Sequence, residues 1–128
     1  MILRPTELQV GKIYHRRTEV AEEADSAACA RLLGEEVQLH EPCLGIVFVW
    51  ALRTLIESDI LPPGAIMMGH EVEWLQPPPL TGPVMTEMSI VQIDPPRRRY
   101  RRVVIGYRSS DSSGADVAFQ KQAVLWPS

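Results

Sequence analysis

Alternation of apolar and polar positions is the strongest pattern in the second half of the chain. From Ile66 to Trp74 every second residue is apolar or aromatic except for His70, and Glu71 and Glu73 occupy the other face. A period of two predicts a strand. Further strand-like segments follow, separated by turn-forming residues: Val84–Asp94, Tyr100–Arg108 and Ala115–Trp126. We therefore predict a meander of long antiparallel strands.

A nearly unbroken apolar run precedes these strands. It extends from Cys43 to Leu52, and its pattern continues to Glu57. The β-branched residues in it would also suit a buried strand, but the length favours a helix that is apolar almost all round. Pro42 is typical of a first helical turn, and Gly45 would allow another backbone to approach closely. We predict a central buried helix from Pro42 to Glu57.

A strand and a helix are predicted before this run. The strand covers Gly11 to Arg17, and Thr18 suits the N-cap of a helix from Glu19 to Leu33, with Gly34 as its C-terminal cap. This order of elements predicts one α+β domain over residues 1–128, in which a long antiparallel sheet wraps around the central buried helix. Because such a sheet has open edges, we expect a homodimer or a higher oligomer.

Composition and charge exclude several classes of partner. The 128 residues carry a net charge of −3, which gives no electrostatic reason to bind nucleic acid or an anionic membrane. The longest apolar run is too short to span a bilayer, and the first residues do not form a signal peptide. We expect a cytoplasmic protein in which Cys29 and Cys43 are buried, reduced thiols.

Three segments carry a resemblance to a known family. They are LQVGKIY from Leu8 to Tyr14, VEWLQPPPLTG from Val72 to Gly82, and AVLWP from Ala123 to Pro127. In order and spacing they resemble the MaoC-like (R)-specific enoyl-thioester hydratases and dehydratases, over nearly the whole chain. The resemblance implies a hot-dog fold and reversible hydration of 2-enoyl thioesters. It implies no cofactor beyond the coenzyme A or phosphopantetheine of the substrate itself.

The catalytic stretch of that family, G-D-x-N-P-x-H, is altered here. Its nearest match is GEEVQLH, Gly34 to His40, which places Glu35 at the aspartate position and His40 at the histidine position. The resemblance then implies an acid–base pair of Glu35 and His40. Alternatively the catalytic loop is deleted, because Pro42 follows almost at once. In that case His40 would cap the central helix or pack at a dimer seam, and Glu35 would be a solvated residue after a helix.

Other residues support further possibilities. Glu41 could act as the base or nucleophile of a thioesterase, or could only complement the helix dipole. An acyl chain would run beside the central helix along Gly45, Phe48, Trp50 and Met68, of which the larger three are otherwise core residues. The three histidines have no ligand spacing, so no metal site is predicted.

The remaining charged feature is the arginine-rich segment from Arg97 to Arg102. It is most simply a solvated hairpin, although it could bind nucleic acid or hold the phosphates of coenzyme A or a carrier arm. His70 is expected in the core or an interface, and His15 is expected to be exposed. Three functions remain open: a hydratase or dehydratase, an acyl-coenzyme A thioesterase, and a non-catalytic MaoC-like subunit that pairs with an active hot-dog partner.

Overall fold

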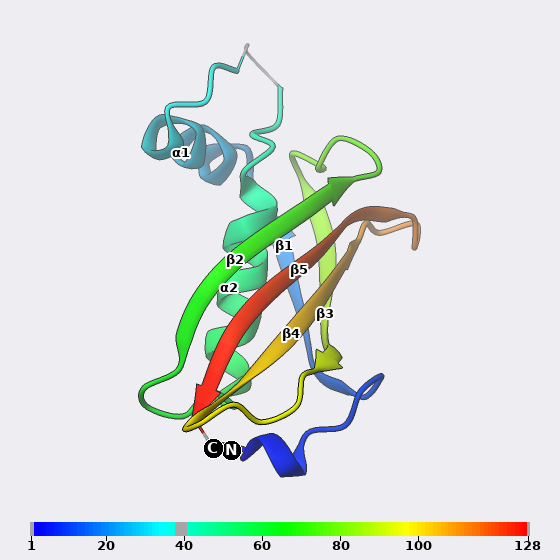
Figure 1. The fold of residues 1–128 in the computed structure, drawn as a ribbon. Helices are drawn as coiled ribbons and strands as arrows, with labels where there is room; N and C mark the ends of the chain where they lie inside the picture. Colours follow the sequence, from blue (N-terminus) through cyan, green and yellow to red (C-terminus); the bar gives the residue numbers. More distant parts are fainter. Residues whose placement is uncertain (1, 38–40, 128) are drawn as a thin grey trace.

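The computed structural model describes residues 2–37 and 41–127, and their elements follow one another as predicted. A short 3-10 helix, η1 (Pro5–Glu7), comes first. The regular elements are β1 (Ile13–Ala21), α1 (Glu23–Leu33), α2 (Ile46–Ser58), β2 (Ile66–Trp74), β3 (Gly82–Ile93), β4 (Tyr100–Ser110) and β5 (Asp116–Pro127). Figure 1 shows α2 along one face of the curved sheet, with α1 beside its N-terminal end.

The five strands form one antiparallel sheet in the order β1-β3-β4-β5-β2. β1 and β2 are therefore its two edges. In β4, the side chains of Val103, Ile105 and Tyr107 pack in the core beside α2. The predicted α+β class and the sheet around a central helix are confirmed.

The core divides into two clusters along α2. One surrounds Ala51 and Leu55 and includes Met88, Ile105 and Trp126. The other surrounds the first turns of α2 and includes Trp50, which is 1% exposed, and both cysteines. The expectation of buried, unpaired Cys29 and Cys43 is confirmed.

The boundary between the first strand and the first helix was predicted wrongly. Thr18 does not cap a helix, because β1 continues to Ala21 and pairs with β3 through Thr18↔Met85 and Val20↔Pro83. The helix begins only at Glu23, and Gly34 ends it in the left-handed conformation, at φ 67°, as predicted. The β-branched Thr18 and Val20 suit an extended strand better than the first turn of a helix.

The central helix begins four residues later than predicted and is not buried all round. It starts at Ile46, and the segment before it is held by Cys43, whose backbone N–H donates to Ser26 Oγ at 2.6 Å. One stripe of its surface remains exposed to solvent. The stripe consists of Leu44, just before the helix, followed by Phe48, Leu52 and Ile56, whose exposed fractions are 44, 36, 48 and 68%.

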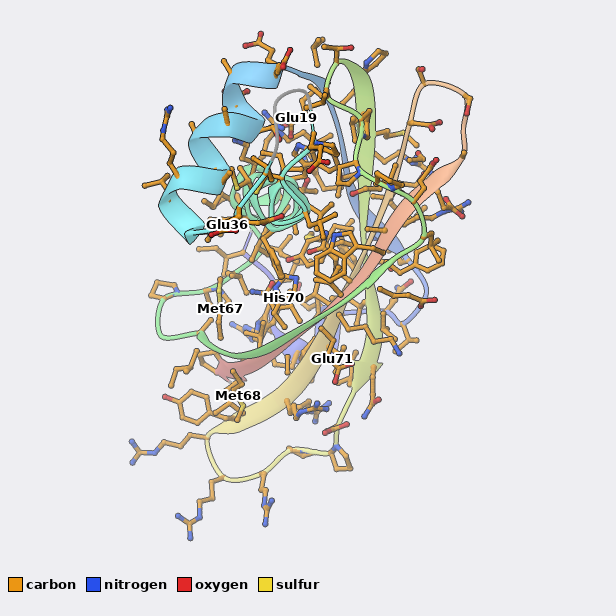
Figure 2. All side chains as sticks on the ribbon, turned by 90° about the horizontal axis from the view of Figure 1, so that it is seen from above. Glu19, Glu36, Met67, Met68, His70 and Glu71 are labelled. Carbon is orange, nitrogen blue, oxygen red and sulfur yellow. The ribbon has the colours of Figure 1, made fainter. Side chains whose placement is uncertain are left out.

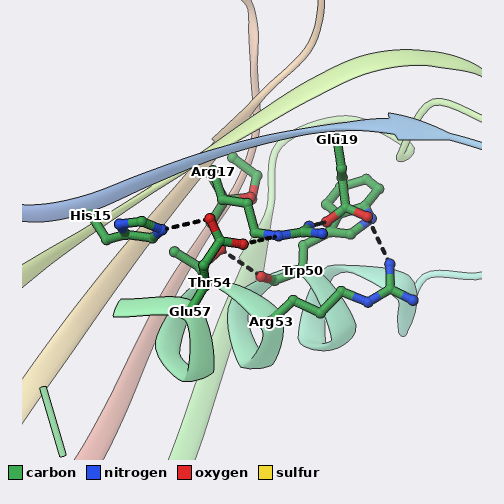
Figure 3. A network of polar contacts seen from close by, with 9 residues as sticks. His15, Arg17, Glu19, Trp50, Arg53, Thr54 and Glu57 are labelled. Atoms are coloured by element: carbon green, nitrogen blue, oxygen red, sulfur yellow. Dashed lines mark hydrogen bonds and ion pairs between the residues drawn. The ribbon is translucent and has the colours of Figure 1, made fainter. Parts of the chain in front are cut away.

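A chain of ion pairs fastens β1 to the C-terminal half of α2 (Figure 3). Glu57 accepts hydrogen bonds from His15 Nε2 at 3.0 Å and from Arg17 Nε at 2.8 Å. Glu19 in turn bridges Arg17 to Arg53, with Arg53 Nη1 at 2.7 Å. His15 is thus half-buried and paired rather than exposed, because the network draws its ring toward α2.

The two ends of the described chain meet beside the sheet (Figure 1). Trp126 Nε1 donates to the backbone oxygen of Leu3 at 2.8 Å, and the Leu3 N–H donates to the oxygen of Ile60 at 3.2 Å. The buried Trp126 indole therefore ties the first residues to the last strand.

Candidate active site

The carboxylate of Glu35 lies at the N-terminus of the central helix. Gly34 turns the chain after α1, and the Glu35 side chain then reaches the residues that open α2. Its Oε1 accepts the N–H of Leu44 at 2.7 Å, and its Oε2 accepts the N–H of Gly45 at 3.1 Å. The Cys43 thiol donates to Oε2 at 3.0 Å. A negative charge is favoured at this position by the helix dipole as well as by these donors.

These contacts decide the charge state of Glu35. Partial burial opposes ionisation, but the hydrogen bonds from Cys43, Leu44 and Gly45 outweigh it and lower the pKa of the carboxyl below its ordinary value. Burial, the Glu35 carboxylate and the Cys29 thiol together raise the pKa of Cys43 to about 12. At neutral pH the pair is therefore an ionised carboxylate beside a neutral thiol.

Gly45 makes this arrangement possible. A Cβ at this position would lie 2.3 Å from Leu33 Cδ1 and 3.4 Å from Glu35 Oε2. Gly45 was predicted to let another backbone approach closely; the groups that approach it are instead the side chains of Leu33 and Glu35. The predicted role of Gly45 in binding substrate remains a prediction.

Aromatic side chains cover the exposed side of this helix start. The Phe48 ring meets His70 edge-on at 4.9 Å and Trp74 edge-on at 6.2 Å. Trp74 Nε1 donates to the backbone oxygen of Leu44 at 3.0 Å, which joins the end of β2 to the start of α2. Phe48 therefore lies between α2 and β2, and its role beside an acyl chain remains a prediction.

Sequence reasoning missed a buried polar chain behind these rings. His70 Nε2 lies 2.7 Å from Gln120 Oε1, and Gln120 Nε2 donates to the backbone oxygen of Val47 at 2.9 Å. The His70 ring also stacks against Tyr107, and burial raises the pKa of that phenol. His70 was expected in the core or an interface; it is partly buried and hydrogen-bonded on the side of β2 that faces Phe48. The signal that Gln120 offered was its place on the same face of the strand as Ala118, Val124 and Trp126, all of which are buried.

Two predicted members of the acyl slot do not lie with Phe48. Trp50 is buried in the core, and Met68 faces away from α2. The pairing of β2 with β5 shifts between Met67 and Gly69, and this bulge reverses which residues face the helix. Met67 consequently contacts Gln122 on the inner side, whereas Met68 is exposed beside Leu125. Both methionines and His70 can be located on β2 in Figure 2.

The two other predicted catalytic residues have different outcomes. His40 lies outside the described residues. Glu41 is exposed and precedes the helix instead of lying in its first turn, but it lines the same cleft as Glu35, between α1 and the start of α2. The structure thus brings Glu35 and Glu41 to one place, and the catalytic roles of all three residues remain predictions.

Two general properties of the described part of the chain bear on function. Within residues 2–37 and 41–127, no group of three His, Cys, Asp or Glu side chains is placed to hold a metal ion. In the same ranges, no helix has both the length and the apolar character needed to cross a membrane.

A curved antiparallel sheet of this strand order around one long helix is the hot-dog fold. The monoamine oxidase regulatory protein from Archaeoglobus fulgius shares it, with a TM-score of 0.84 and 15% identity, over 98% of this chain and 95% of that one. The MaoC-like dehydratase from Rhodospirillum rubrum does so with a TM-score of 0.81 and 19% identity, over 98% of both chains.

A third solved structure is a complex. It is the C-terminally truncated HadBC 3R-hydroxyacyl-ACP dehydratase from Mycobacterium tuberculosis, with a TM-score of 0.75 and 14% identity, over 91% of this chain and 96% of that one. No protein-family model and no curated protein sequence matches the chain. The likeness to MaoC-like proteins that three segments indicated is therefore confirmed in the fold.

Proposed function

We propose that this protein catalyses the reversible hydration of 2-enoyl thioesters, with coenzyme A or an acyl-carrier protein as the thiol component. The observation that carries the proposal is the ionised Glu35 carboxylate at the N-terminus of the central helix of a hot-dog fold. Two solved proteins with this fold are described as a MaoC-like dehydratase and a 3R-hydroxyacyl-ACP dehydratase, which supports the same chemistry for this chain.

The proposed reaction uses a general base, a general acid and a backbone N–H donor. Glu35 takes a proton from water while the water oxygen bonds to C3, and the electrons of the C2–C3 double bond move onto the thioester oxygen as an enolate. His40 then supplies the proton that C2 receives. A backbone N–H at the helix start stabilises the enolate. The Gly45 amide suits this task, because its 3.1 Å bond to Glu35 is longer than the 2.7 Å bond from Leu44.

One observation favours a second candidate, a non-catalytic hot-dog subunit. Glu35 already accepts the hydrogen bonds of both Leu44 and Gly45, which are the donors that an enolate would need. Because the Glu35 side chain already occupies the amides at the start of α2, the protein would suit the role of a subunit that supports an active partner. The assembly of HadBC from hot-dog chains supports this type of pairing.

A hydration assay separates the candidates. With crotonyl-coenzyme A, we expect the wild type to consume the conjugated thioester, and Glu35→Gln and His40→Ala to lower kcat/KM by about 10²–10⁴-fold. Glu22→Gln removes an exposed carboxylate at the start of α1 and serves as the matched control. No turnover by the wild type would favour the non-catalytic subunit. Release of free thiol that is lost in Glu41→Gln would favour a thioesterase.

We also propose that two copies pair through β2. This strand is an edge of the sheet, and Ile66, Met67 and Met68 on it are 47–59% exposed. The exposed stripe of α2 from Leu44 to Ile56 lies on the side that β2 borders, since Phe48 contacts His70 and Trp74. Antiparallel pairing of β2 with its copy would cover both the open edge and the stripe.

Sedimentation analysis tests this dimer. We expect the wild type to sediment as a dimer and Leu52→Lys, in the middle of the stripe, to shift it to the monomer. Leu32→Lys is the matched control, because Leu32 is 88% exposed on α1, away from the stripe. A monomeric wild type, or a dimer that Leu52→Lys leaves intact, would contradict the pairing.

A further inference from the structure

The peptide group between Leu44 and Gly45 is hydrogen-bonded at both of its ends. Its N–H, which belongs to Gly45, donates to Glu35 Oε2 at 3.1 Å. Its C=O, which belongs to Leu44, accepts the indole Nε1–H of Trp74 at 3.0 Å. The two bonds form one chain that runs from the indole through the peptide to the carboxylate. Because bonds in such a chain polarise one another, the indole makes the Gly45 N–H a stronger donor.

The same peptide lies in the middle of a β-turn. The Ile46 N–H donates to the backbone oxygen of Cys43 at 3.2 Å, which closes a turn over these four residues. Gly45, the third of them, has φ −68° and ψ −8°, as in a type I turn. A type II turn differs by about half a rotation of the central peptide, and it needs a φ of about +80° at the third residue. Glycine adopts both values readily, so this turn can take either form.

Rotation of the central peptide would exchange the directions of its two ends. The Leu44 oxygen would then face the Glu35 carboxylate, and the Gly45 N–H would point away from it. Glu35 opposes this rotation only while its carboxylate stays on Gly45. In the proposed reaction Glu35 turns to water and the enolate oxygen takes the Gly45 N–H. A second group must therefore hold the peptide during the reaction.

Trp74 is well placed to be this second group. It is the last residue of β2, and the chain after it is fastened to β5, because the Leu75 N–H donates to the backbone oxygen of Val117 at 2.9 Å. The Phe48 ring meets the indole edge-on and supports it from the side of α2. Trp74 is 41% exposed, so replacing it with phenylalanine opens no cavity in the core.

We propose that Trp74 is a positioning residue whose indole N–H holds the Leu44–Gly45 peptide in the orientation that aims the Gly45 N–H at the enolate oxygen. The inference rests on the proposed function, because the enolate is the group that uses this N–H. Trp74 acts through the peptide and takes no part in proton transfer. A tryptophan that only packed against Phe48 could be replaced by phenylalanine without any effect on the peptide.

Nuclear magnetic resonance of the Gly45 amide tests this hold without any turnover. In Trp74→Phe we expect relaxation dispersion from microsecond-to-millisecond rotation of the peptide, at an amplitude above that of the wild type. The pKa of Glu35, followed through the same resonance, should rise toward its ordinary value, because the carboxylate loses a donor for part of the time. Trp126→Phe is the matched control, since it removes an indole bond to a backbone oxygen elsewhere in the molecule. The proposal is overturned if Trp74→Phe leaves the Gly45 dispersion unchanged, or if Trp126→Phe alters it equally.

Kinetics with crotonyl-coenzyme A separate this inference from the proposed function. Trp74→Phe should lower kcat about tenfold and leave KM nearly unchanged, because the aimed N–H matters most for the charge that develops in the transition state. Turnover by the wild type with an unchanged kcat in Trp74→Phe would overturn the positioning role and keep the hydratase. Absence of turnover in the wild type, together with peptide rotation in Trp74→Phe, would refute the hydratase and keep the hold of Trp74 on the peptide.

Discussion

Glu35 and Glu57 lie at opposite ends of the central helix, and each has a lowered pKa for a different reason. Around Glu35 the donors are two backbone amides and a buried thiol. Around Glu57 they are the side chains of His15 and Arg17, whose hydrogen bonds lower the pKa of an otherwise solvent-exposed carboxyl.

Glu35 is therefore a charge that the backbone holds in place, whereas Glu57 is held by mobile side chains. Backbone amides at a helix start are fixed by the fold, so Glu35 has one defined location at the candidate site. Long charged side chains around Glu57 must lose rotamer freedom to meet, and solvent screens them, so that the net gain is small. We therefore expect the two carboxylates to respond differently to substitution, pH and salt.

Removal of the Glu35 side chain should have the largest effect on stability. Glu35→Ala leaves the amides of Leu44 and Gly45 without their acceptor, and we expect the free energy of unfolding to fall by about 1–2 kcal/mol, as for loss of a helix N-cap. Glu57→Ala should cost clearly less. Urea denaturation of both variants checks the order, and an equal or larger loss in Glu57→Ala would reverse the comparison.

Lowering the pH should also reduce stability more through Glu35 than through Glu57. The loss should be smaller than the loss caused by the alanine substitutions. Both pKa values are lower in the folded state, so the stability that each carboxylate contributes is fully present above the ordinary pKa of glutamate. It is lost as the pH falls through the folded-state pKa. We expect urea stability to decrease below about pH 5, and to decrease less steeply in Glu35→Gln than in wild type. A profile of identical slope in both proteins would contradict a lowered pKa for Glu35.

Salt should have the smallest effect on stability, and it should change only the contribution of the Glu57 end of α2. Raising NaCl toward 1 M shortens the screening length to about 3 Å. The stability difference between wild type and Glu57→Gln should then shrink, while the difference between wild type and Glu35→Gln persists. Thermal unfolding at low and high salt measures both differences, and a salt-insensitive Glu57→Gln difference would show that its network is not governed by screened charges.

Regular patterning made much of the fold predictable. β2 was expected from Ile66 to Trp74 and lies there, since alternation and flanking prolines mark both ends. The bulge after Met67 could not be predicted, because Met67 and Met68 are equally apolar and either one suits the inner face. The start of α1 was misplaced because Thr18 resembles an N-cap, whereas pairing with β3 extends the strand through it.

The candidate site was predictable only in part. The likeness of GEEVQLH to a catalytic stretch drew attention to Glu35, but its contact with the α2 amides depends on how Gly34 turns the chain and how Gly45 admits the side chain. Gln120 was missed because a polar residue in a strand normally faces solvent. It is buried here because His70 and the oxygen of Val47 satisfy its amide.

The contact between Trp126 and Leu3 has a consequence for protein engineering. Residues near both ends of the described chain are held side by side, so a short linker between them would demand little rearrangement of the fold. New ends could be opened in the tight turn after Asp111, whose carboxylate accepts the N–H groups of Ser113 and Ala115. Such a circular permutant would begin with β5, which lies between β4 and β2 in the sheet, and would leave the start of α2 unaltered.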